Sequence, residues 1–216
     1  MTPEAIVHYL RQHPEFFEEQ IEFLSTVALP HPHGGRTVSI SERQILTLRE
    51  KGKQLEDKLR ELIEFGEQND VIGEKMHRLT LAMIATRDAV SAIQALYFHL
   101  REDFSVPHTA IRLWPQWDHP QTTEFSEVSM ASRDFATSLG APYCSPKSMV
   151  DTADWFGEVA PHLRSFAYVA LKSQDSTIGL LAMASEDAQR FYPEMGTLYL
   201  KRLGDIAATT LLRYLA

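Results

Sequence analysis

Residues 39–83 read SISERQILTLREKGKQLEDKLRELIEFGEQNDVIGEKMHRLTLAM. Apolar side chains recur here at alternating steps of three and four residues, and charged residues fill most of the places between them. This spacing predicts a long helix with a narrow apolar seam, the pattern of a coiled coil. Its members are Ile45, Leu48, Leu55, Leu59 and Leu62, with Gly52 filling one gap. A compact fold of 216 residues would hardly cover so long a seam, so we expect a homodimer, parallel or antiparallel.

Both ends of this helix carry signals. Ser39 and Glu42 form a capping box at its start. Beyond Leu62 the stripe continues with one additional three-residue step through Phe65, Asn69, Ile72, Met76, Leu79 and Met83. Such a step locally overwinds a coiled coil, and glycines weaken the helix in the same stretch. A bending or register-shifting segment and a simple irregularity both fit this pattern.

The first 38 residues predict short helices and a loop. Thr2 and Pro3 are typical of a helix start, here a helix to about Gln12. Pro14 opens a second helix that extends to about Thr26. The segment Leu29-Pro-His-Pro-His-Gly-Gly35 predicts a loop, because its prolines and glycines oppose both helix and strand.

The second half of the chain predicts a mixture of helices and strands. Asp88 caps a helix to about Asp103, and an amphipathic helix closes the chain. The expected elements between them are strands at 109–114 and 125–129, a short helix at 131–139, a loop at 140–146, and strands at 166–172 and 177–185 joined by a turn. This order favours an α+β fold with an antiparallel sheet flanked by helices. We expect segments 1–38, 39–85 and 86–216.

Composition bounds the function. The net charge is −8, and no basic stripe is visible, so we expect no direct binding to nucleic acid. We recognise no signal peptide and no apolar run of membrane-spanning length, and we expect a cytoplasmic protein without a membrane partner. Cys144 is the only cysteine, which excludes an internal disulfide and a zinc site built from several thiolates.

The order of elements in the second half resembles a GAF domain, a small-molecule-sensing relative of PAS domains. The strings His13-Pro-Glu-Phe-Phe17, Leu29 to Gly35, Ser39 to Gln44 and Gly179 to Ser185, with Arg190-Phe-Tyr-Pro193, resemble the bacterial "domain of unknown function 484" family. The resemblance covers nearly the whole chain. It implies a GAF-like fold behind a helical region and no established activity. Genes of this family often lie near a tyrosine recombinase gene, which hints at DNA recombination or cell division.

Side chains of the second half could line a ligand pocket. Arg112 and Trp114 share one face of a strand, and an arginine there could hold a carboxylate or phosphate through two hydrogen bonds. The alternative is a surface arginine packed on Trp114. The full set of pocket candidates is Arg112, Trp114, Tyr143, Trp155, Tyr168, Met183 and Ser185.

Other chemistry has weaker support in the sequence. Arg190 to Glu194 shares little with the signature expected of cyclic-nucleotide GAF domains. A single thiol cannot complete the disulfide cycle of GAF-like methionine sulfoxide reductases, and we take Cys144 as a structural thiol rather than a redox sensor. His31 and His33 could supply two metal ligands, but a third is missing, and a packed loop explains them as well.

We therefore expect a non-enzymatic dimeric regulator that binds an unidentified small molecule and signals through an unknown protein partner. No catalytic set of residues stands out, and no cofactor is identified. The alternative is a protein-protein adaptor with a degenerate pocket, linked to DNA recombination or cell division.

Overall fold

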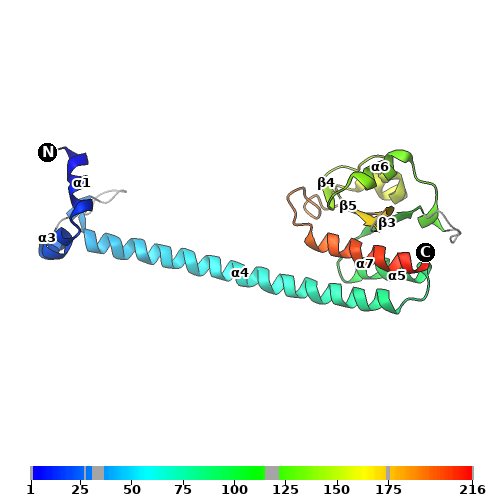
Figure 1. The fold of residues 1–216 in the computed structure, drawn as a ribbon, viewed down its shortest axis with the longest axis horizontal. Helices are drawn as coiled ribbons and strands as arrows, with labels where there is room; N and C mark the ends of the chain where they lie inside the picture. The colour runs from blue at the N-terminus through cyan, green and yellow to red at the C-terminus, as the bar shows by residue number, and fades with distance from the viewer. Residues whose placement is uncertain (1, 27, 31–36, 115–121, 174–175, 216) are drawn as a thin grey trace. The chain divides into compact units, whose positions relative to one another are not determined.

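The computed structural model describes residues 2–26, 28–30, 37–114, 122–173 and 176–215. These fall into two compact units, residues 1–69 and 70–216, and Figure 1 labels elements of both. The second unit begins within the long helix. Residues 70–85 of this helix therefore lie in the unit that contains the sheet.

The first unit is helical apart from a short ribbon. Helix α1 spans Pro3–Gln12, and the Thr2 hydroxyl accepts a hydrogen bond from the Ala5 amide, as expected of a cap. The predicted second helix is two helices, α2 Glu15–Glu19 and α3 Ile21–Thr26, because Gln20 leaves the helical conformation. The loop prediction is wrong at its start, since β1 Ala28–Pro30 pairs with β2 Thr37–Ser39. A proline is tolerated at the end of such an edge strand, where its missing N–H is not needed.

Helix α4 extends from Ile40 to Ala85 and confirms the predicted long helix. The seam residues of the first unit are exposed: Leu55 by 68%, Leu59 by 58% and Leu62 by 65%. The later part of the stripe behaves differently, because Met76, Leu79 and Met83 are buried in the core of the second unit. The apolar pattern therefore has two parts. The seam residues of the first unit are exposed, and the later residues of the stripe pack within the second unit.

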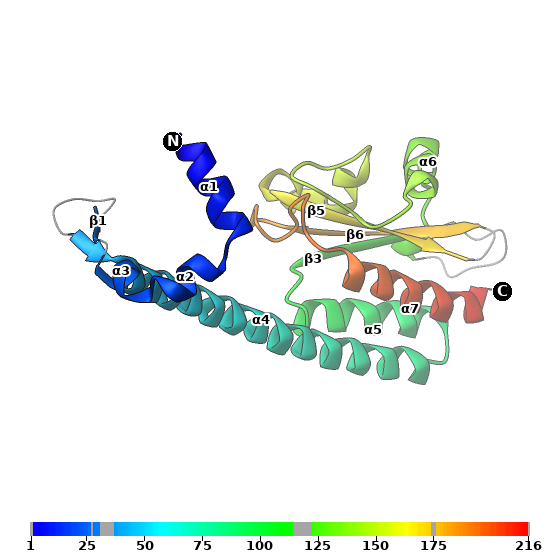
Figure 2. The same cartoon turned by 60° about the vertical axis from the view of Figure 1, so that its left-hand side comes forward.

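The second unit is built on a four-stranded antiparallel sheet of order β3-β6-β5-β4. Its strands are β3 His108–Leu113, β4 Tyr143–Ser145, β5 Ser165–Lys172 and β6 Thr177–Ser185. Helices α5 Ala89–Glu102 and α7 Leu198–Leu215 lie side by side against one face, and α6 Met130–Ser138 lies on the other (Figure 2). This confirms the predicted α+β fold, with an antiparallel sheet between helical layers.

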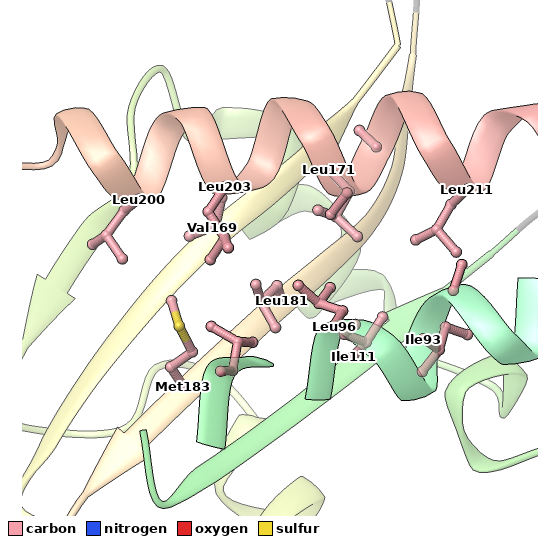
Figure 3. Close-up of a cluster of buried hydrophobic side chains, with 14 of the residues drawn as sticks. Ile93, Leu96, Ile111, Val169, Leu171, Leu181, Met183, Leu200, Leu203 and Leu211 are labelled. Atoms are coloured by element: carbon pink, nitrogen blue, oxygen red, sulfur yellow. The ribbon is translucent and has the colours of Figure 1, made fainter. Parts of the chain in front are cut away.

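The main core lies between the sheet and the helices α5 and α7. Leu200, Leu203 and Leu211 of α7 and Ile93 and Leu96 of α5 extend toward the sheet (Figure 3). The strands contribute Ile111, Val169, Leu171, Leu181 and Met183. Gly204 allows α7 to approach β5, since a Cβ atom there would lie 2.4 Å from Val169 Cγ1.

Two element predictions in the second unit are wrong. The expected strand at 125–129 does not form, since Phe125 ends the 3₁₀ helix η1 Thr123–Phe125 and residues 126–129 belong to no helix or strand. The expected loop at 140–146 contains β4, which pairs with β5 through Tyr143, Cys144 and Ser145. Pro142 and Pro146 bound this strand and limit it to three residues, which made it resemble a loop.

None of the helices among the described residues has the length and apolar character needed to cross a membrane.

Candidate functional site

Arg112 lies in β3 on the face of the sheet opposite the main core. Its neighbours Ile111 and Leu113 belong to the main core, and side chains alternate along a strand, so Arg112 faces the other side with Trp114. Only 8% of Arg112 is exposed. Its guanidinium carbon lies 5.2 Å from the ring centroid of Trp155, which stands in the 3₁₀ segment η2 Thr152–His162. The structure therefore brings together two of the predicted pocket residues.

The guanidinium of Arg112 uses little of its hydrogen-bonding capacity. Its Nη1 donates to the Ile111 carbonyl at 2.9 Å. Among the described residues it forms no other hydrogen bond and no ion pair. Burial lowers the pKa of Arg112, and the nearby Tyr97 and Glu124 partly oppose this effect. A charged group in this position is a candidate for binding an oxyanion.

Tyr97 connects helix α5 to this strand. Its hydroxyl accepts a hydrogen bond from the Ile111 amide at 3.1 Å and donates to Glu124 Oε1 at 3.3 Å. Burial raises the pKa of Tyr97 well above its ordinary value, so the hydroxyl is neutral at physiological pH. Tyr97 thereby fixes the position of Ile111, whose carbonyl in turn holds Arg112.

Cavities lie on two sides of Tyr97. The larger, of about 330 Å³, is also lined by Trp155, Phe156, Arg101 and His108. The smaller, of about 140 Å³, is also lined by Gln94 and Glu124. In the larger cavity His108 bonds to Glu186 at 2.7 Å and Arg101 lies 3.8 Å from Glu102. In the smaller cavity the Glu124 carboxylate lies in the wall itself, so the two cavities offer different surroundings to a charged ligand.

Trp114 and Tyr168 share this face of the sheet and are occupied by local contacts. The Trp114 indole donates to the Thr177 carbonyl at 2.7 Å, and the guanidinium of Arg133 lies 5.7 Å from its ring. The Tyr168 hydroxyl accepts from the Met149 amide and pairs with Thr152, both at 2.9 Å. These contacts explain both side chains as structural members of the second core cluster.

The other pocket candidates lie elsewhere. Met183 belongs to the main core on the far face. Ser185 is buried at the end of β6, where its hydroxyl accepts from the Asp187 amide at 3.1 Å. Tyr143 is exposed on the edge strand β4 and makes an edge contact with Phe135. The structure thus does not bring these three to Arg112.

The remaining candidates concern thiol and metal chemistry. Cys144 is buried, and burial raises the pKa of its thiol, which disfavours the reactive thiolate. His31 and His33 lie outside the described residues. Within the described part of the chain, no group of three His, Cys, Asp or Glu side chains forms a metal-binding cluster.

Sequence reasoning missed three polar residues near Arg112 and Trp114. Tyr97 lies in the helix predicted from Asp88 to about Asp103, and the prediction gave its hydroxyl no role. Glu124 and Arg133 drew no attention, because each is an ordinary charged residue of a short segment. The Nε atom of Arg133 is buried without a hydrogen-bond partner. The signal for Tyr97 was its amphipathic character, since a buried tyrosine hydroxyl requires a partner.

The family described as "Protein of unknown function, DUF484" matches residues 1–216. The uncharacterized protein YigA of Salmonella typhimurium is 24% identical over 212 residues, covering 92% of this chain and 86% of the relative. YigA of Escherichia coli is 23% identical over 206 residues, covering 89% and 83%.

Solved structures also resemble part of the chain. The GAF domain of the potassium sensor histidine kinase KdpD from Escherichia coli matches with 17% identity and a TM-score of 0.43, covering 66% of this chain and 94% of that domain. The free methionine-R-sulfoxide reductase of Neisseria meningitidis, solved with its substrate, matches with 20% identity and a TM-score of 0.49, covering 65% and 88%.

Proposed function

The chain belongs to the DUF484 family, and we propose that it is a non-enzymatic, dimeric, GAF-like regulator. The second unit binds a small molecule beside Arg112 and Trp155, and the bound state is passed to a partner protein. The cytoplasm is the compartment we expect, because a chain with one cysteine suits a reducing environment.

One observation carries the ligand-binding part of this proposal. Arg112 is almost fully buried, lies on Trp155, and has no acidic partner among the described residues. Burying a charge without a partner lowers the stability of the fold. A bound ligand with the opposite charge would supply the partner that the described residues do not provide. A cavity of about 330 Å³ that shares the Trp155 wall can accept a small molecule.

The exposed seam supports the dimer. In the first unit, Leu48, Leu55, Leu59 and Leu62 are each more than half exposed. A repeated apolar stripe with charged flanks is suited to a second helix of the same kind, because each seam residue then packs into the partner helix. We assign this part of α4 to self-association.

The experiment is to purify the protein under native conditions and identify what small molecules co-purify. Trp155→Ala removes one wall of the site, and Phe98→Ala, at an exposed aromatic of α5, is the matched control. We expect a bound molecule in the wild type and in Phe98→Ala, and its loss in Trp155→Ala. A molecule that Trp155→Ala retains, or none in any sample, would contradict the proposal.

The adaptor function is the second candidate, and the filled face of the sheet favours it. Phe166, Tyr168 and Leu180 are buried together with Trp114, Phe135 and Phe156 packed around them. A face filled by the protein's own side chains leaves little room for a ligand. The adaptor function predicts that no small molecule co-purifies, while partner binding survives changes at Arg112 and Trp155.

A further inference from the structure

We propose that the ligand of this site carries a carboxylate or phosphate group and that Arg112 binds it. This inference rests on the proposed function, since it names the chemical class of the small molecule. A proton transfer or covalent step is not part of it. Arg112 acts as a binding residue that pairs with the anionic group and orients it.

The charge of Arg112 has no counter-ion of its own. Among the described acids, Glu124 acts on the charge of Arg112 through space and forms no ion pair with it. The Glu124 carboxylate instead accepts the hydrogen bond from Tyr97. An incoming anion would therefore supply the missing partner without displacing an existing salt bridge.

The unpaired N–H donors of Arg112 suit a bidentate contact. With Nη1 bonded to the Ile111 carbonyl, Nε and Nη2 have no described partner, and neither is among the side-chain nitrogens sealed from solvent. These two N–H groups lie on one edge of the planar guanidinium, which matches two oxygens of a carboxylate or phosphate. The Trp155 ring centroid lies 5.2 Å from the guanidinium carbon, and this contact restricts the movement of the guanidinium before a ligand binds.

Local charge favours the side of the larger cavity. Arg101 and His108 line that cavity, and each lies beside a carboxylate, Glu102 and Glu186 respectively, so they add little net charge there. Glu124 lines the smaller cavity and repels an anion there. We therefore expect the anionic group to approach Arg112 from the Trp155 side.

The test is thermal unfolding of the whole chain with sodium phosphate, sodium succinate and uncharged succinamide, each compared with sodium chloride at equal ionic strength. The variants are Arg112→Met, Arg112→Lys and the matched control Arg164→Met, which changes an exposed arginine. Circular dichroism confirms that each variant is folded.

We expect phosphate or succinate, and not succinamide, to raise the melting temperature of the wild type and of Arg164→Met. Arg112→Met should weaken the apparent affinity by about tenfold or more, because a charge-assisted pair is lost. The apparent affinity of Arg112→Lys should lie between those of the wild type and Arg112→Met, since lysine keeps the charge but cannot form the bidentate contact. The anion that acts shows whether the natural group is a phosphate or a carboxylate.

The inference is overturned if neither anion stabilises the wild type beyond chloride, or if Arg112→Met binds as the wild type does. The co-purification experiment separates this failure from failure of the proposed function. A neutral molecule whose co-purification requires Trp155 and not Arg112 would support the proposed function and contradict the binding of an anionic group. If no molecule co-purifies with any sample, both the proposed ligand-binding function and the anion-binding inference are contradicted.

Discussion

Tyr168 is a fully buried residue whose hydroxyl joins β5 to the segment before η2. Thr152 Oγ1 donates to the Met149 carbonyl at 2.6 Å, so the Tyr168 hydroxyl donates to Thr152 and accepts from the Met149 amide. Tyr168→Phe leaves that amide without its partner and should lower the free energy of unfolding by about 1–2 kcal/mol. Urea unfolding measures this, and Tyr143→Phe, at an exposed ring, is the control. Equal stabilities of the two variants would contradict the role of the hydroxyl.

Asp103 gives a pH-dependent prediction. Hydrogen bonds from Arg78 at 2.7 Å and from His99 at 2.5 Å lower the pKa of its carboxyl. A lowered folded-state pKa stabilises the protein above the unfolded value of about 3.9, and this contribution is lost as the pH falls through the folded-state pKa. Asp103→Asn should therefore flatten the loss of stability below about pH 4. Acid unfolding measures this, with Asp134→Asn, at an exposed aspartate of α6, as the control. The same acid sensitivity in Asp103→Asn and Asp134→Asn would contradict a stabilising role of the Asp103 hydrogen bonds.

Single residues show what the sequence could and could not predict about the site. Strand alternation placed Arg112 and Trp114 on one face, because that periodicity is local. The contact of Arg112 with Trp155 joins residues that lie far apart in sequence, so spacing alone could not pair them. Met183 was named with them as a pocket candidate, but the strand register places it on the far face.

At the scale of helices and strands, two glycines should respond in opposite ways. Gly204 of α7 packs on Val169 of β5, whereas nothing lies within 4 Å of a Cβ atom added at Gly73 of α4. Gly204→Ala should destabilise the protein by about 1–2 kcal/mol, because crowding outweighs the gain in helix propensity. Gly73→Ala should stabilise it by up to about 1 kcal/mol. Chemical denaturation measures both, and a stabilising Gly204→Ala would contradict the close packing.

The elements with strong local signals were predictable. The N-cap at Asp88 and the turn closed by the Ser173 amide on the Ser176 carbonyl are where the sequence predicts them. The short pieces were not, because β4 and the β1–β2 ribbon each have only three residues per strand. So few residues carry no periodicity, and tertiary pairing decides their conformation.

At the scale of the whole molecule, the exposed seam predicts how the protein assembles. Leu55→Asp with Leu59→Asp places charges in the seam and should convert a dimer to a monomer, since neither carboxylate can be buried without a partner. Gln54→Asp with Gln68→Asp adds the same charge away from the seam residues and is the matched control. Light scattering after size exclusion measures the mass. A variant with both leucines changed that stays dimeric would contradict the assignment of the seam to self-association.

Native mass spectrometry of freshly purified protein is the most direct test of a ligand-binding dimer. We expect a dimer that carries a reproducible additional mass, and we expect Arg112→Met to lose this mass while remaining dimeric. A monomer, or a dimer whose mass equals that of two chains alone, would contradict the ligand-binding dimer.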